Sequence, residues 1–140
     1  MKILFLDIDG VVNCSSTRQR HRGYIGIDPF MALLIGRITI AHPDLKVVLS
    51  SSWRNFDGGR VEVERQVVPI FDTTPRAASG IRGSEIKMWL DEHPEVTKYA
   101  IIDDDEDMLD EQLPNFFKTS WQTGITQEIV DRVIEHYNQK

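Results

Sequence analysis

Two carboxylates stand near the start of the chain, in the run Asp7-Ile8-Asp9-Gly10, directly after the apolar residues 3–6. The apolar run is typical of a buried parallel strand, so both carboxylates are expected at its carboxyl end, where α/β sheets bind ligands. If the strand persists, the two side chains point the same way. Such charges repel unless a cation or a shared proton relieves them, and Mg²⁺ suits oxygen ligands of this kind. The alternative is a turn that only ends the strand, which Asp and Gly also favour.

Further residues capable of chemistry follow two other predicted strands. Residues 98–102 form a second apolar run that leads into the acidic cluster 103–107. Residues 46–49 form a third, which ends in Ser50 and Ser51. Because the carboxyl ends of parallel strands meet at one edge of a sheet, we expect these groups to lie near the first carboxylate pair.

The elements that must position these residues alternate between strands and helices. Arg82 begins an amphipathic helix for which Ser84 is the expected cap. Asp28 caps a helix that runs to about Ala41, and Thr126 caps the last helix. This alternation predicts an α/β fold, a three-layer α/β/α sandwich with a central parallel sheet. The other expected elements are a helix over residues 58–68 and short strands over 69–71 and 116–118.

The length of 140 residues is that of a single domain, and we expect one compact enzyme domain over residues 1–140. Residues 14–27 are polar and contain glycine, which predicts a flap or minimal cap beside the site. Neither gap between the motifs is long enough for a further domain that would cover the site. The predicted site is therefore open, and an open site suits a macromolecular end better than a small metabolite that must be enclosed.

The net charge of −6 is unevenly distributed. Residues 14–82 carry ten Lys and Arg against six Asp and Glu, whereas residues 83–140 carry five against fourteen. For any one arginine a solvated loop position is the alternative, but as a set they indicate an anionic substrate larger than one phosphate. Tyr24 and Phe56 are candidates for stacking on a base. The arginines assigned to substrate binding are Arg18, Arg20, Arg22 and Arg54.

Cysteine usage and hydropathy bear on location. The single cysteine, Cys14, cannot form an internal disulfide, and no apolar stretch approaches the ~20 residues of a membrane span. The chain begins with a core strand, so we expect no signal peptide, no membrane partner and a cytoplasmic location. The four histidines do not have a zinc-ligand spacing. The oligomeric state stays open.

In order along the chain, these motifs resemble those of the haloacid dehalogenase (HAD) superfamily of phosphohydrolases. Its first motif, hhhhDxDG with h hydrophobic, is matched by residues 3–10, and its second, a Ser or Thr that ends a strand, by Ser50. Arg82 matches the third, a Lys or Arg before a helix; the acidic pair Asp103 and Asp104 matches the fourth. The segments LSSSWR and RGxEIxxWLxxHPE, the strand ending DDD and the Thr-Gly-Ile-Thr before the last helix resemble the small HAD domains termed Swiss Army Knife RNA repair-like. This resemblance covers nearly the whole chain.

The resemblance implies a HAD-like Rossmannoid fold and an Mg²⁺-dependent phosphatase. Asp7 would be the nucleophile that forms an aspartyl-phosphate, and Asp9 would act as general acid and base. Mg²⁺ would be held by Asp7, the backbone carbonyl of Asp9 and one residue of the acidic pair. Asp104 is the expected ligand of that pair, and Asp103 is the alternative.

The resemblance also implies how the transferring phosphoryl group is bound. Ser50, with Ser51 beside it, and Arg82 would bind its oxygens. Arg82 replaces the more usual lysine of the family, so Lys87, just over one turn further along the helix, is the second candidate for this cation. Asp107 is a candidate partner of the metal ligands.

Three classes of function follow. The first is a phosphohydrolase whose partner is a phosphorylated substrate, a nucleic-acid end or a nucleotide. The second is a phosphatase of small metabolites or phosphoproteins with the same machinery. The third is a catalytically idle HAD-like or receiver-like module that binds Mg²⁺ or a partner. The presence of all four motif positions argues against the idle module.

Overall fold

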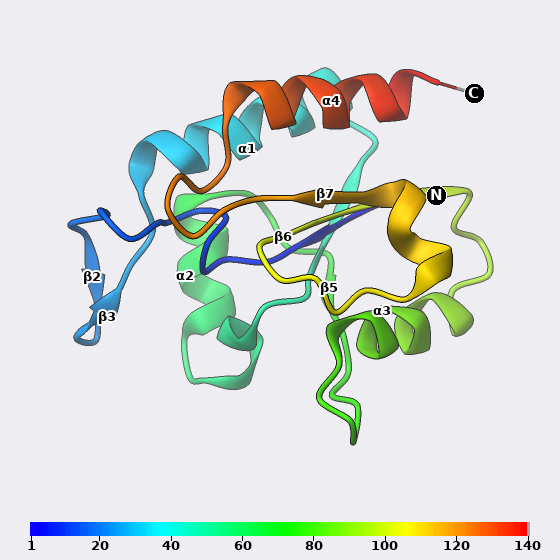
Figure 1. Cartoon of the computed structure of the whole chain (residues 1–140), viewed down its shortest axis with the longest axis horizontal. Coiled ribbons are helices and arrows are strands. Elements are labelled where there is room, and N and C mark those ends of the chain that lie inside the picture. The colour runs from blue at the N-terminus through cyan, green and yellow to red at the C-terminus, as the bar shows by residue number, and fades with distance from the viewer. Residues whose placement is uncertain (140) are drawn as a thin grey trace.

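The computed structural model describes residues 1–139 and is built on a five-stranded parallel sheet (Figure 1). Its strands are β1 (Lys2–Leu6), β4 (Lys46–Leu49), β5 (Asp72–Thr73), β6 (Lys98–Asp103) and β7 (Phe116–Lys118). Their order in the sheet is β5-β4-β1-β6-β7, so the first strand of the chain lies at the centre. A central β1 places whatever follows it between the ends of two neighbouring strands.

Helices cover both faces of this sheet. On one side α1 (Pro29–Ala41) lies beside α4 (Gln127–Asn138), and on the other lies α3 (Arg82–Asp91) (Figure 1). Val63 of α2 (Gly59–Gln66) packs in the same buried cluster as α1 and α4. Side chains of β1 alternate between the layers, because Leu4 and Leu6 join that cluster while Ile3 and Phe5 pack with α3. The predicted three-layer α/β/α sandwich without a large cap domain is confirmed.

Two local predictions need correction. The strand expected over 69–71 lies later, at β5. Pro69 has no N–H to donate to a neighbouring strand, and the first backbone hydrogen bond to β4 runs from Phe71 N to Val47 O, 2.8 Å. Ser84 is not the cap of α3, since the helix already begins at Arg82. The helix caps Asp28 and Thr126 are as predicted, and each side chain accepts a backbone N–H of its helix.

The segment 14–27 forms the expected small excursion beside the carboxyl end of the sheet. It contains an antiparallel hairpin, β2 (Arg20–His21) and β3 (Tyr24–Ile25), which projects away from the sheet in Figure 1. Two 3₁₀ helices, η1 (Ser52–Asn55) and η2 (Asp110–Asn115), follow β4 and β6, and neither was predicted. No helix within residues 1–139 is long and apolar enough to cross a membrane.

Candidate active site

The register of the sheet places three candidate residues in one row. Leu6 of β1 pairs with Leu49 of β4 on one side and with Ile102 of β6 on the other. The next residue of each strand is Asp7, Ser50 or Asp103. The row is tied by backbone hydrogen bonds from Asp7 N to Ile102 O, 3.1 Å, and from Ser50 N to Leu6 O, 3.0 Å. The nucleophile candidate, the hydroxyl and the later acidic pair therefore meet at the carboxyl edge of the sheet.

Asp7, Asp103 and Asp104 form an acidic cluster at this edge. One carboxylate oxygen from each lies within 4.8 Å of the others. Asp7 and Asp103 are buried, and Asp104 is half-buried. Burial, and then the charge of Asp103, raises the pKa of Asp7 well above its usual range. Burial also raises the pKa of Asp103, to about 6. The cluster is thus costly to ionise in the bare protein.

Gly10 explains how Asp104 reaches the other two carboxylates. Its φ of +81° is in the left-handed region, and a Cβ placed on it would lie 2.1 Å from Asp104 Oδ2. The missing side chain therefore lets the Asp104 carboxylate lie directly against the loop that follows β1. Thr119 fixes the same loop by donating its hydroxyl to Gly10 O, 2.6 Å, while its backbone N–H donates to Asp103 O, 3.0 Å.

Asp9 lies apart from this cluster. The strand ends at Leu6, so the alternation expected to align Asp7 and Asp9 does not apply, and Asp9 is exposed. Its Oδ1 accepts hydrogen bonds from Asn13 Nδ2, 2.9 Å, and from Trp53 Nε1, 3.2 Å. Both bonds go to one oxygen, and no hydrogen bond from residues 1–139 goes to the other. The side chain is therefore oriented while Oδ2 stays available.

Asn13 and Trp53 are site residues that sequence reasoning missed. Asn13 is fully buried, accepts Gly10 N at its Oδ1, 2.8 Å, and also donates to Gly26 O, 3.0 Å. It thereby joins the loop of Asp9 to the flap. Trp53 is buried, and its indole N–H donates to Asp9. Only the position of Asn13 three residues after Gly10, a spacing at which an Asn side chain can bond to the backbone of a loop, could have indicated it.

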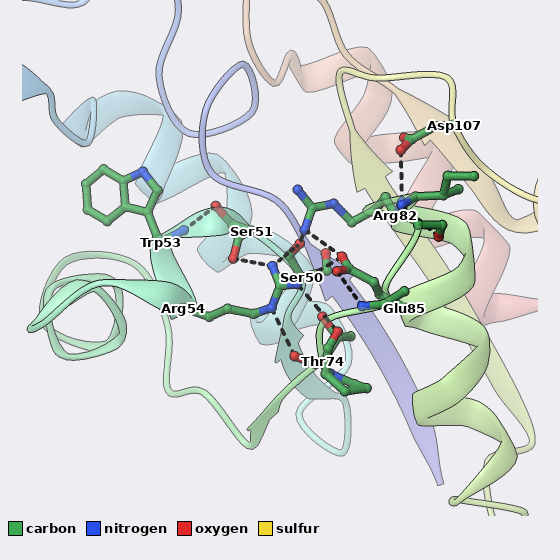
Figure 2. Close-up of polar contacts among 12 residues, drawn as sticks. Ser50, Ser51, Trp53, Arg54, Thr74, Arg82, Glu85 and Asp107 are labelled. Atoms are coloured by element: carbon green, nitrogen blue, oxygen red, sulfur yellow. Dashed lines mark hydrogen bonds and ion pairs between the residues drawn. The ribbon is translucent and has the colours of Figure 1, made fainter.

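Arg82 lies at the other side of the row. Its Nη1 donates to Ser50 O (Figure 2). Its Nε lies 3.6 Å from Asp103 Oδ2. Ser50 is fully buried, and its Oγ has no hydrogen-bond partner within residues 1–139. Native proteins rarely leave such an oxygen unpaired, so this hydroxyl is available to a ligand. A cation and a free hydroxyl thus lie together beside Asp7.

Arg54 does not lie where a substrate-binding arginine would. Its side chain is only 4% exposed and pairs with Glu85 Oε1 at 2.9 Å. It also donates to Ser51 O, 2.7 Å, and to Thr74 O, 2.9 Å (Figure 2). The prediction fails because Glu85, a buried carboxylate thirty-one positions away, holds the guanidinium inside. Arg54 and Glu85 therefore position the loop after β4, and sequence reasoning missed this part of the site.

The remaining candidates are distributed as follows. Lys87 points outward from α3 and pairs with Asp91 at 3.1 Å, which raises its pKa. The structure therefore does not bring Lys87 to the phosphate-binding row. Ser51 is buried there, and its Oγ accepts Trp53 N, 3.2 Å, as the cap of η1. Asp107 accepts a backbone N–H at the start of α3.

The three flap arginines have different surroundings. Arg18 is exposed. Arg20 Nη1 donates to two carbonyls of its own segment, Thr17 O at 2.9 Å and Gln19 O at 3.0 Å, so it braces the flap. Arg22 lies at the tip of the hairpin and lines a cavity next to Asp9. Of the three, Arg22 alone lines this cavity.

The acidic cluster fits a hard divalent cation. It supplies three carboxylates, the ligand type that Mg²⁺ prefers, from two different strand ends. Asp103 Oδ2 is buried without a hydrogen-bond partner among the described residues, and the Arg82 Nε at 3.6 Å is too far for one. A cation would satisfy this oxygen and offset the cost of ionising Asp7 and Asp103, whose pKa values are raised mainly by burial. Asp7, Asp103 and Asp104 are therefore the residues that would hold Mg²⁺.

Asp107 couples the acidic loop to the helix of Arg82. Its Oδ2 accepts Arg82 N, 2.8 Å, and its backbone O accepts Gly83 N, 3.1 Å. It caps α3 from twenty-five positions away, in place of a residue before the helix. A Cβ on Gly83 would lie 2.7 Å from Leu109 N, so only glycine allows this close approach.

Replacing Asp107 by Ala is expected to lower the free energy of unfolding by about 1 kcal/mol, the usual cost of a lost cap. The substitution Asp107→Asn keeps an oxygen acceptor and should cost less. Urea unfolding of both variants, with the exposed Asp110→Ala as control, measures the difference. Equal stability of Asp107→Ala and the unchanged protein would show that the cap does not stabilise α3.

Comparison with known proteins agrees with this geometry. The family model described as the HAD domain in Swiss Army Knife RNA repair proteins matches residues 3–130. The search of curated proteins and the search of solved structures gave no match. The matched span contains the row at the sheet edge, the acidic cluster, Arg82 and the flap. On this match and this geometry, the chain belongs to the HAD domains of Swiss Army Knife RNA repair proteins, a family that supports a phosphohydrolase of the HAD type.

Proposed function

We propose that the protein is an Mg²⁺-dependent phosphohydrolase that works through an aspartyl-phosphate on Asp7 and acts on the phosphate of a nucleic-acid end or a nucleotide. The observation that carries this proposal is the row in which the sheet register sets Asp7 between Ser50 and Asp103. With Arg82 at its side, the row combines a nucleophile, phosphate-binding donors and candidate metal ligands. Positioning and electrostatics of this kind supply most of phosphoryl-transfer catalysis.

In the first step an oxygen of Asp7 attacks the phosphorus, and the bond between phosphorus and the ester oxygen breaks. The leaving oxygen takes a proton from the Asp9 carboxyl group. In the second step Asp9 takes a proton from a water that attacks the phosphorus. The bond to Asp7 then breaks, which releases inorganic phosphate and restores the Asp7 carboxylate and the protonated Asp9 carboxyl group.

The other residues of the site serve this sequence by binding and orientation. Ser50 Oγ and the Arg82 guanidinium would donate to the transferring phosphoryl oxygens. Asn13 and Trp53 hold one oxygen of Asp9, so that the other can exchange protons. Mg²⁺, held by the acidic cluster, would supply charge that favours ionised Asp7 and polarises the phosphoryl group.

The open edge of the site supports a substrate that extends beyond one phosphate. The flap is a short hairpin with an exposed tip, and it does not form a domain that could enclose a small molecule. It carries Arg18 and Arg22, both exposed, and Arg22 lines a cavity next to Asp9. A nucleic-acid end offers further phosphates to such side chains.

A phosphatase screen with added Mg²⁺ tests the proposal. It compares sugar phosphates, phosphorylated peptides, mononucleotides and oligonucleotides with a 3′- or a 5′-phosphate. We expect the highest kcat/KM on an oligonucleotide, with an advantage that shrinks as salt is added. Highest activity on a sugar phosphate would move the assignment to metabolites, and no turnover of any ester would favour an idle module.

On the best substrate, Arg82→Ala is expected to lower kcat/KM by about 10²- to 10³-fold, as for other lost transition-state donors. Lys87→Ala is the matched control on the same helix, because Lys87 is exposed and paired with Asp91. Steady-state kinetics of both variants decides which cation serves the site. A larger loss for Lys87→Ala would reverse this assignment.

A further inference from the structure

A cavity of about 670 Å³ adjoins Asp9 between the hairpin of the flap, η1 and the loop after β7. It has the size of typical small-molecule pockets. Aromatic side chains dominate its lining. They are His21, Tyr24, Trp53, Phe56 and Trp121, and Arg22 adds a cation.

Three of these rings form a continuous wall. His21 stacks on Trp53 with ring centroids 5.3 Å apart and an interplanar angle of 26°. Phe56 lies 5.3 Å from Trp53 on the same wall. Tyr24 and Trp121 add rings that are 78% and 37% exposed. On ordinary protein surfaces, exposed apolar side chains are scattered singly. Exposed aromatic groups gathered around one cavity therefore mark a binding surface.

The cavity also has polar groups in its lining. Arg22 contributes a guanidinium and Asp9 a carboxylate. Asp9 lines the cavity. The indole of Trp53, which is part of the cavity wall, donates to Asp9 Oδ1, 3.2 Å. A ring bound here would therefore sit beside the residue that protonates the leaving oxygen.

We propose that this cavity binds the base of the terminal nucleotide, the one whose phosphate is removed. The inference rests on the proposed function and adds the part of the substrate that is recognised. A flat ring with polar edges matches both the aromatic wall and the polar groups of Arg22 and Asp9 in the lining. The base must leave its stack to enter, so the substrate is an unpaired terminal nucleotide and a blunt duplex end is disfavoured.

The charge around the cavity favours a base over the phenol ring of a phosphotyrosyl peptide. Arg22 lines the cavity, and Arg18 lies exposed on the same flap. Cations at this position attract the next phosphates of a polynucleotide, whereas a peptide brings no regular anionic backbone. A phosphotyrosyl peptide is accordingly the competing substrate in the test.

The experiment measures kcat/KM on four phosphate-terminated substrates in Mg²⁺: a single-stranded oligonucleotide, the same strand with an abasic terminal residue, its blunt duplex and a phosphotyrosyl peptide. Glycerol phosphate serves as an ester without a ring. We expect the intact single strand to be preferred over the other three. Tyr24→Ala and Phe56→Ala should lower kcat/KM for this strand by about 5- to 150-fold, the range for a lost base-stacking ring.

The two variants should leave turnover of glycerol phosphate and of the abasic strand nearly unchanged. Phe30→Ala is the matched control, since Phe30 is 65% exposed on α1 and does not line the cavity. Equal kcat/KM for the intact and the abasic strand would overturn the inference, as would preference for the duplex or the peptide. Equal losses on glycerol phosphate and on the strand would also overturn it.

A binding measurement separates this inference from the proposed function. Fluorescence polarisation follows the labelled intact and abasic strands on the Asp7→Asn variant, which keeps the cavity. Tighter binding of the intact strand, weakened by Tyr24→Ala, supports the cavity even if no ester is turned over, in which case only the phosphatase proposal fails. Equal binding of both strands overturns the cavity whatever the activity.

Discussion

The substitution Asp7→Asn is expected to abolish phosphatase turnover and, in the metal-free protein above pH 6, to raise the melting temperature. Asn keeps the shape of Asp but cannot attack phosphorus, so kcat should fall by about 10³-fold or more. The stability should rise because burial and the neighbouring Asp103 make a charged Asp7 unfavourable. Kinetics on the best substrate and thermal unfolding in EDTA measure the two effects.

Asp9→Asn provides the matched control for this pair of effects. It should also stop turnover, because an amide cannot exchange the proton. It should not raise the melting temperature, since Asp9 is exposed and an amide oxygen can still accept from Asn13 and Trp53. Near-normal turnover in Asp7→Asn would exclude Asp7 as the nucleophile. A fall in its melting temperature in EDTA would contradict the account of the acidic cluster.

The positions of Asp7, Ser50 and Asp103 could be anticipated from the sequence because they depend on local patterns. Each follows an apolar run, and parallel strands of a sheet end at a common edge. The register that sets them in one row pairs Leu6 with Leu49 and with Ile102. A buried strand has little freedom to slip, because a shift by one residue exchanges its two faces.

The parts of the site that could not be anticipated depend on contacts between distant segments. Asp107 caps α3 across twenty-five positions, and Ser84, the locally favoured cap, lies inside the helix. Arg54 is of a residue type that often binds substrate phosphates, but Glu85 pairs with it in the interior. A loop pattern does not reveal which arginine meets a buried carboxylate, because that depends on how β4 and α3 pack. Arg54 and Glu85 therefore belong to the supporting structure of the site.

Removal of metal is expected to eliminate turnover and to leave a protein whose stability depends on pH. EDTA should stop catalysis, because Asp7, Asp103 and Asp104 are proposed to hold the ion that favours ionised Asp7. In the bare protein the folded pKa of Asp103 is raised from 3.8 to about 6. The folded state then binds more protons than the unfolded state between these values. The stability contributed by protonation of Asp103 in the folded protein is therefore lost as the pH rises from about 4 to above 6.

Mg²⁺ competes with those protons, so it should raise the melting temperature more at pH 7.5 than at pH 5. Thermal unfolding with Mg²⁺ or EDTA at both pH values measures this difference, which mass action links to affinity. Asp103→Asn should reduce both the pH dependence in EDTA and the gain from Mg²⁺. Asp105→Asn, an exposed carboxylate in the same loop, should leave both unchanged. An Mg²⁺ effect that is equal at the two pH values would place the metal away from this cluster. Undiminished turnover in EDTA would exclude the metal from the reaction.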